Sequence, residues 1–314
     1  FKSFYVRRVL RILPLYYGAI IIVFALRAIL PNAGVWGNHG DLLSSGSFFW
    51  PLVFLENIAP LTGSVNSTGI LTHYWSLAVE EHFYLVWPLL IWLVSRRWAL
   101  RLAIGAAGIS IAIRMLLYHY GPGLYTIFAV TPLRMDGLAI GAIAAILLRT
   151  HGVNTVARPA WMLLVASLMM LAALLAIRQT TEQTDPANWI FFYPLVATCT
   201  AATLLICGTN GWLSRLLSFG VLRWFGKYSF GLYIWHPVVG MLLFHSQVAL
   251  ASTASSPARI LAVAGFISLL DLAIAWASFN FFEKRFLDLK RNFPANAGTA
   301  RIIDARAMAV EPLK

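Results

Sequence analysis

The feature that most constrains this chain is a series of long apolar blocks, each long enough for a helix to cross a membrane. A spanning helix needs roughly 20 apolar residues. Charged residues make up 11% of the chain, against about 25% in a soluble domain. The sequence therefore predicts an all-α fold, a polytopic membrane bundle of about eight transmembrane helices. The expected spans are residues 12–30, 77–95, 101–119, 131–149, 160–177, 188–206, 228–247 and 259–282.

The distribution of basic residues predicts how these spans are oriented. The formal net charge is +12, which by itself could indicate a nucleic-acid partner. However, 19 of the 24 Lys and Arg residues lie on one side of the eight-span arrangement, and the opposite loops, 31–74, 120–130 and 246–258, contain none. Such an excess is typical of cytoplasmic loops. We therefore expect both chain ends to be cytoplasmic, and a lipid bilayer rather than nucleic acid as the partner.

Motifs for several other functions are missing from the sequence. It holds no P-loop, no dinucleotide-binding glycine fingerprint and no G-x-S-x-G elbow. The two cysteines, Cys199 and Cys207, are eight residues apart and show no metal-ligand spacing. No metal and no tightly bound cofactor are therefore expected. The apolar piece 48–60 is too short to span and is predicted to be re-entrant or interfacial.

An acidic pair stands at the start of the second span, in "HYWSLAVEEHFYLVWP" (73–88). Ionisable residues inside a membrane are costly and by default indicate a functional site. Helical spacing places Ser76 and Glu80 on one stripe, whereas Glu81 points about 100° away. Either the pair is solvated at the membrane surface, or a carboxylate binds a substrate hydroxyl or orients a base. We expect Glu80 to face the bundle interior.

Two further charges enter the fourth span, in "PLRMDG" (132–137). Arg134 and Asp136 are about 200° apart on a helix, so they do not pair with each other. Glu80 or Glu81 is the predicted partner of Arg134, because both segments begin on the outer side. Arg134 and Asp136 either hold helices together or act directly on a substrate, and both interpretations stay open.

The seventh span carries a polar stripe on an apolar helix. Ser229, Tyr233 and His236 are spaced i, i+4 and i+7. An intramembrane histidine usually marks a cavity or a relay, and the alternative is a core histidine bonded to a backbone carbonyl. Arg114 in the third span and Asp271 in the eighth also need partners, and they could pair with each other.

Four stretches, in this order and spacing, resemble the membrane acyltransferase family 3. They are "RRVLRILPLYY" (7–17), "HYWSLAVEEHFYLVWP" (73–88), "PLRMDGLAIGAI" (132–143) and "FGKYSFGLYIWHP" (225–237). The second stretch is the most specific. The family modifies bacterial surface sugars, peptidoglycan and some secondary metabolites. Its domains typically have ten helices, so the resemblance implies a fragment that lacks two helices ahead of Phe1.

The resemblance implies a donor, an acceptor and a set of site residues. The donor is cytoplasmic acyl-CoA, with acetyl as the expected acyl group, and the acceptor is a hydroxyl of a carbohydrate or related molecule. The family's base histidine lies on a helix that this sequence does not contain, so the fragment alone is expected to be inactive. The catalytic candidates in the chain are Glu80, Glu81, Arg134, Asp136 and His236, and the substrate-binding candidates are Trp75, Ser76 and Tyr233.

Three arginines precede the first span and are the candidates for binding the donor. Arg8 and Arg11 are spaced i, i+3 and share a helix face, with Arg7 beside them. One interpretation is that they only anchor the helix on the cytoplasmic side. The other is that an arginine fork, which suits phosphate geometry, holds the phosphates of acyl-CoA.

Two functions from different classes remain. The first is a multi-pass O-acyltransferase of the bacterial inner membrane, with a membrane domain at 1–291 and a loose cytoplasmic tail at 292–314. The alternative is a transporter or flippase for a lipid-linked or sugar substrate, in which intramembrane charges line a path. The ordered motifs favour the enzyme, because no transport mechanism requires them.

Overall fold

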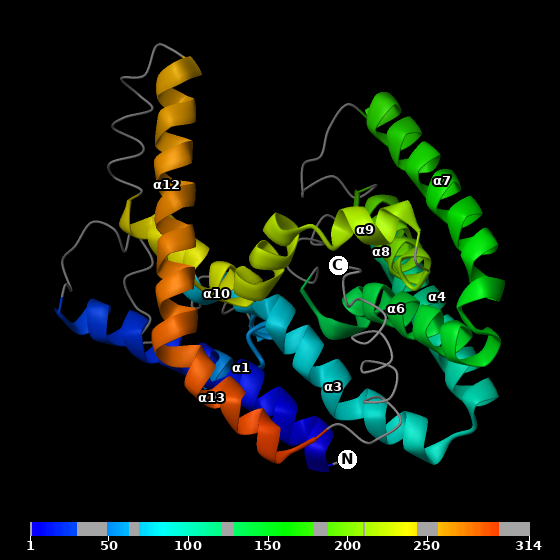
Figure 1. Cartoon of the computed structure of the whole chain (residues 1–314), viewed down its shortest axis with the longest axis horizontal. Helices are drawn as coiled ribbons and strands as arrows, with labels where there is room; N and C mark the ends of the chain where they lie inside the picture. Colours follow the sequence, from blue (N-terminus) through cyan, green and yellow to red (C-terminus); the bar gives the residue numbers. More distant parts are fainter. Residues whose placement is uncertain are drawn as a thin grey trace, which may run out of the picture. The chain divides into compact units, whose positions relative to one another are not determined.

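The structure is a computed structural model that describes residues 2–29, 49–62, 69–120, 129–178, 188–209, 211–243 and 257–294. Within these ranges the regular elements are helices, and none is a strand (Figure 1). The predicted all-α class is confirmed. The predicted tail, 292–314, lies almost wholly outside the described residues.

The chain divides into two compact units, which we describe one at a time. The terminal unit comprises residues 1–40 and 224–314, and the central unit comprises residues 41–223. Helix α10 (Gly220–Leu242) begins at the border and belongs mostly to the terminal unit.

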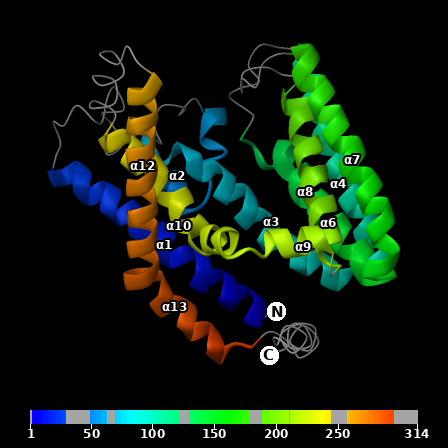
Figure 2. The ribbon, with the colours of Figure 1, turned by 45° about the horizontal axis from the view of Figure 1, so that its top comes forward.

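The central unit is built around five long helices in its described part. These are α3 (Trp75–Leu93), α4 (Arg96–Tyr120), α6 (Thr131–His151), α7 (Val153–Arg178) and α8 (Tyr193–Cys207). The shorter elements are α2 (Phe49–Leu52), η2 (Ala59–Thr62), η3 (Gly69–Tyr74), η4 (Asn188–Phe192) and α9 (Trp212–Leu217). Helix α6 packs against α4 and α8, and α7 packs against α8, so the four lie side by side in Figure 2.

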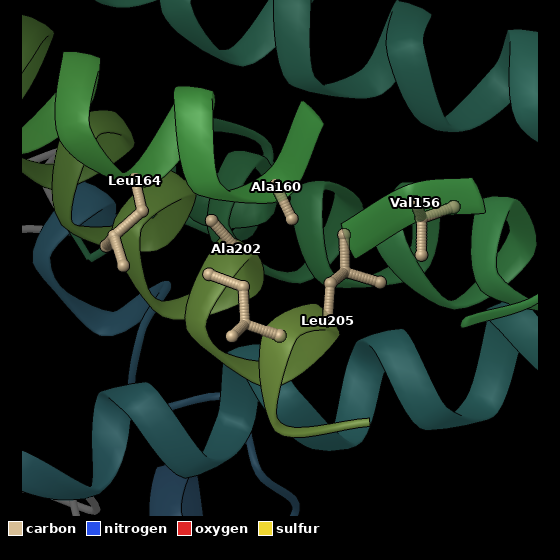
Figure 3. Packing of buried hydrophobic residues seen from close by; sticks show 6 residues of the cluster. Val156, Ala160, Leu164, Ala202 and Leu205 are labelled. Carbon is tan, nitrogen blue, oxygen red and sulfur yellow. The ribbon is translucent and has the colours of Figure 1, made fainter. Parts of the chain in front are cut away.

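The contact between α7 and α8 forms a hydrophobic core. It contains six buried apolar residues, shown in Figure 3: Val156, Ala160, Leu164, Ala202, Leu205 and Ile206. The α7 members repeat every four residues, which places them on one helix face. Ala160 and Ala202 are almost fully buried, and small residues at such contacts let membrane helices approach closely.

The terminal unit contains α1 (Lys2–Ile29), α10 and a nearly continuous C-terminal helical stretch. That stretch consists of α12 (Pro257–Ser278), η5 (Phe279–Glu283), α13 (Lys284–Asp288) and η6 (Leu289–Asn292). Element η5 is a π-helical turn, in which hydrogen bonds run from i to i+5. Helix α1 packs against η5, α13 and η6. A Cβ on Gly18 would lie 3.4 Å from the Phe282 ring, so this glycine permits the close approach.

Six of the described helices are long and apolar enough to cross a membrane. They are Lys2–Ile29, Arg96–His119, Thr131–His151, Val153–Arg178, Ile190–Cys207 and Ala258–Asn292, and they match six of the eight predicted spans. The other two predicted spans are helical, as α3 and α10, but they are not among these six helices. The chain is a multi-pass membrane protein, whereas the number eight stays a prediction.

Candidate active site

The first turns of three helices meet around Arg134 in the central unit. The Arg134 guanidinium lies 4.4 Å from the ring centre of Tyr193 and 5.2 Å from that of Trp75, and both distances are within cation–π range. Trp75 begins α3, Arg134 lies in the first turn of α6, and Tyr193 begins α8. The structure thus brings together two predicted site residues, Trp75 and Arg134. It adds Tyr193, which no sequence motif had indicated.

Thr131, at the start of α6, is the centre of a hydrogen-bond network. Asn57 Nδ2 donates to Thr131 Oγ1 at 2.7 Å, and His82 Nδ1 lies 2.7 Å from the same oxygen. The His82 ring also hydrogen-bonds to the backbone of Phe54, whose φ of 57° is rare for a non-glycine residue. Asn57 is fully buried. The apolar piece 48–60 is therefore joined to both α3 and α6 through polar groups that sequence reasoning missed.

The acidic pair lies between these two contacts. Glu80 and Glu81 are half-buried on α3, and one carboxylate oxygen of Glu81 is fully buried. They follow Trp75, which contacts Arg134, and immediately precede His82, which contacts Thr131. Both glutamates are therefore at the end of the central unit where Arg134 lies, and the expected Glu80–Arg134 site stays a prediction.

Ser76 lies on the same turn of α3 as Trp75. Its Oγ is 3.5 Å from the carbonyl oxygen of His73, at the outer limit for a hydrogen bond. The side chain is half-buried. This position is compatible with the expected substrate-binding role of Ser76.

Asp136, in contrast, forms a buried ion pair. Its Oδ2 lies 2.7 Å from Arg114 Nη2, and the two side chains are 4% and 1% exposed. Ser110 Oγ also donates to Asp136 Oδ1, at 3.4 Å. The predicted pair between Arg114 and Asp271 is wrong, because α4 packs directly on α6 and offers Arg114 a nearer carboxylate. This geometry supports the helix-joining interpretation for Asp136.

The polar stripe of α10 bonds largely to its own helix. His236 Nδ1 lies 2.9 Å from the carbonyl oxygen of Tyr233 and 3.2 Å from that of Leu232. Ser229 Oγ likewise donates to a carbonyl one turn earlier. These contacts match the backbone-bonded interpretation of His236. In addition, Asp271 on α12 interacts electrostatically with His236, which gives the stripe a carboxylate that spacing along one helix could not reveal.

The three N-terminal arginines have three different environments. Arg7 Nη1 donates to the carbonyl oxygens of Phe293 at 3.2 Å and Lys290 at 3.5 Å. The Arg8 guanidinium lies 5.6 Å from the ring centre of Phe4. Arg11 lines a cavity of about 280 Å³. Only Arg11 of the predicted fork therefore lines this cavity.

Metal ligation has no evident site in the part of the chain that the structure describes. There, no three His, Cys, Asp or Glu side chains are grouped closely enough to hold a metal ion.

Comparisons with known proteins relate the chain to acyltransferases. A family model described as an acyltransferase domain matches residues 1–277. YrhL of Bacillus subtilis (strain 168), whose name proposes it as a peptidoglycan O-acetyltransferase, is 28% identical over 253 residues, which cover 76% of this chain and 39% of YrhL. The peptidoglycan O-acetyltransferase OatA of Listeria monocytogenes is 24% identical over 249 residues, which cover 76% of this chain and 40% of OatA.

The matched region is only part of each relative. The chain spans about 40% of the length of YrhL and OatA. No solved structure matches the chain.

Proposed function

The chain belongs to the acyltransferase-domain family, and on that premise we propose that it is the membrane part of an O-acyltransferase. It moves an acyl group, expected to be acetyl, from cytoplasmic acyl-CoA to a hydroxyl of peptidoglycan or another bacterial surface glycan. The name of OatA supports acetyl transfer and a peptidoglycan acceptor. The proposed location is the bacterial inner membrane, with both chain ends in the cytoplasm, because the basic residues lie predominantly on one side.

The observation that carries the proposal is the guanidinium of Arg134, which packs over the rings of Trp75 and Tyr193. Acyl transfer passes through a tetrahedral intermediate whose oxygen is negatively charged. A guanidinium stays protonated and offers five N–H donors. Because Arg134 packs against Trp75 and Tyr193, its side chain is positioned to stabilise that oxygen or to bind an acceptor oxygen.

The neighbouring residues of α3 are proposed to hold the acceptor. A carboxylate of Glu80 or Glu81 accepts a hydrogen bond from the acceptor hydroxyl and fixes its direction of attack. The Trp75 ring and the Ser76 hydroxyl provide an apolar face and a polar contact for a sugar ring. In the reaction, the hydroxyl oxygen bonds to the thioester carbonyl carbon and the C–S bond breaks. The hydroxyl proton passes through a base to the CoA thiolate.

His236, with Tyr233 beside it, is proposed as a catalytic residue of the terminal unit. The Nδ1 contacts to helix carbonyls are satisfied when Nδ1 carries the proton, so the lone pair of the neutral ring lies on Nε2.

The donor is proposed to bind at the cytoplasmic end of α1. Arg8 and Arg11 provide charge for the phosphates of acyl-CoA. Arg7 donates to backbone carbonyls near the C-terminal end of the described chain, and so supports this region without needing to contact the donor.

The function is tested with the full-length protein that carries this chain, expressed in cells. Surface glycans are analysed by mass spectrometry with wild type, Arg134→Gln and a matched control, Arg149→Gln, which lies exposed in the last turn of the same helix. Acyl mass increments should be present with wild type and Arg149→Gln, and absent with Arg134→Gln. If the acyl mass increments are unchanged in Arg134→Gln, Arg134 does not have the proposed role in acyl transfer. Unchanged glycan mass with altered lipid sidedness would favour the transporter or flippase.

The orientation is tested by labelling. A cysteine at Ser45 should react with a reagent that cannot cross the membrane, and a reporter fused after Asn292 should be active in the cytoplasm. External labelling of a cysteine placed in 96–100 would contradict the proposed topology.

A further inference from the structure

The terminal unit contains a cationic cavity that the proposed catalytic roles do not use. Its volume is about 280 Å³, and it lies among α1, α10 and the segment from η5 to η6. Three cations from distant parts of the sequence line it: Arg11, Lys227 and Lys290. We propose that Arg11, Lys227 and Lys290 together bind phosphate groups, either those of the acyl-CoA donor or that of an anionic lipid headgroup. The donor arm of this proposal rests on the proposed function.

The balance of charge in the cavity favours an anion. Among the lining residues, a single carboxylate, that of Glu283, faces the three cations. Glu283 is buried and already accepts a hydrogen bond from Ser278 Oγ at 3.2 Å. Lys290 also experiences the positive charges of the N-terminal arginines, most strongly that of Arg11. Like charges held together are costly, and a bound phosphate would offset that cost through charge-assisted hydrogen bonds.

Two of the cations are held in place before any ligand binds. Lys227 Nζ lies 4.7 Å from the ring centre of Phe279 and 5.0 Å from that of Tyr228, within cation–π distance. Lys290 is positioned through its backbone, because Arg7 donates to its carbonyl oxygen and to that of Phe293. Arg7 is therefore a positioning residue for the cavity.

The size and walls of the cavity restrict the ligand. Its volume of about 280 Å³ is just below the roughly 300–1,000 Å³ of pockets that hold whole small molecules. It therefore takes part of a ligand, such as a diphosphate or a headgroup. Phe230 and Phe279 also line it, and they offer an apolar wall to the organic group attached to the phosphate.

The test measures binding to the full-length protein in nanodiscs of neutral phosphatidylcholine, with coenzyme A and inorganic pyrophosphate as probes. Lys227→Gln and Lys290→Gln should each weaken coenzyme A binding roughly tenfold, since each removes a charge-assisted hydrogen bond. Pyrophosphate should compete with coenzyme A. Lys284→Gln is the matched control, because Lys284 is exposed on α13 and does not line the cavity. Lys227→Arg keeps the charge and should retain binding.

A second arm distinguishes the two sources of phosphate. In nanodiscs that contain phosphatidylglycerol, native mass spectrometry counts the lipids that stay bound. Fewer retained phosphatidylglycerol molecules in both lysine variants, with unchanged coenzyme A affinity, would support the cavity with the lipid as its ligand. Unchanged coenzyme A affinity, pyrophosphate competition and lipid retention in both variants would overturn the proposal.

Acyl-transfer assays separate this proposal from the proposed function. With the donor as ligand, both variants should raise KM for acyl-CoA and keep kcat, because the cavity holds phosphates away from the reacting carbonyl. Acyl transfer with an unchanged KM for acyl-CoA in both variants would contradict acyl-CoA as the ligand of the cavity. It would not contradict the proposed function. If coenzyme A binding depends on the two lysines but the wild-type protein transfers no acyl group, the phosphate site would be supported and the proposed function would be contradicted.

Discussion

The two units of the protein treat their positive charges in opposite ways. In the central unit, Arg114 is almost completely buried and is paired with the carboxylate of Asp136 at 2.7 Å. In the terminal unit, Arg11, Lys227 and Lys290 line one cavity together with a single carboxylate. A paired, buried charge joins helices, whereas several like charges around a cavity leave room for an external anion. Buried charge therefore holds helices together in the central unit, whereas the clustered cations of the terminal unit are suited to binding an anion.

Arg134 is intermediate between these two cases. It belongs to the central unit, and its guanidinium packs over the faces of two aromatic rings, those of Trp75 and Tyr193. Such contacts fix the plane of a guanidinium while its N–H groups point along the plane.

The largest expected effect is on the stability of the central unit. Arg114→Met should destabilise the protein by about 3–5 kcal/mol, because it leaves the Asp136 carboxylate buried without its cation. The double variant Arg114→Met/Asp136→Leu should recover much of that loss. Thermal unfolding of the purified protein in detergent measures both. Equal loss in the single and double variants would show that the pair is not the helix-joining contact that the comparison assumes.

The next largest effect is expected on catalysis, at the acidic pair. Glu80→Gln should lower the rate of acyl transfer by a factor of about 100 or more, because a carboxylate that positions a hydroxyl proton is worth that much. Membrane insertion and expression should stay unchanged. Initial rates with full-length protein, beside those of Glu81→Gln, show which carboxylate matters. Wild-type rates in both variants would favour the solvated-pair interpretation.

A smaller effect is expected at the network around Thr131. Thr131→Val removes the oxygen to which Asn57 donates and the partner of His82 Nδ1, at an expected cost of about 1–3 kcal/mol. The matched control is Thr150→Val at the other end of α6. Its exposed hydroxyl donates to the Ile146 carbonyl of the same helix, so the effect of the control should stay within about 0.5 kcal/mol. Equal unfolding midpoints for the two variants would argue against the network.

The smallest effect is expected where α10 meets the C-terminal helical stretch. A Cβ on Gly231 would lie 3.3 Å from Glu283 Oε1 and 3.4 Å from Ala275. Overpacking of this kind costs about 1–3 kcal/mol, partly offset by the roughly 0.5–1 kcal/mol that alanine gains over glycine in a helix. Gly231→Ala should therefore lose about 1 kcal/mol, measured by thermal unfolding.

The control for this prediction lies on the same helix. A Cβ on Gly240 would meet nothing within 4 Å, so Gly240→Ala should be neutral or slightly stabilising. A similar gain in thermal stability in both variants would mean that the packing around Gly231 can accommodate a methyl group without cost.

The sequence predicts the fold class and the family for physical reasons that are local. The length and composition of an apolar block determine whether it can span a membrane, and motif spacing identifies relatives. Helical periodicity also predicts which residues share a face, as it does for Ser229, Tyr233 and His236. All of these inferences use one segment at a time.

Partners on other segments could not be predicted in the same way. Periodicity shows that Arg114 needs a carboxylate, but only the packing of α4 on α6 selects Asp136 over Asp271. The contact of Asn57 with Thr131 joins residues that no motif relates.

The π-helical turn η5 sets the rotational phase of everything that follows it. An α-helix turns by about 100° per residue, and a π turn accommodates one residue more than a regular turn does. Regular α-helical winding of all five residues of Phe279–Glu283 would rotate Leu287 and Lys290 by about 100°, away from the cavity. The π turn thus fixes which face of the following segment meets the cavity, whereas deleting one residue from the turn would leave that face in place.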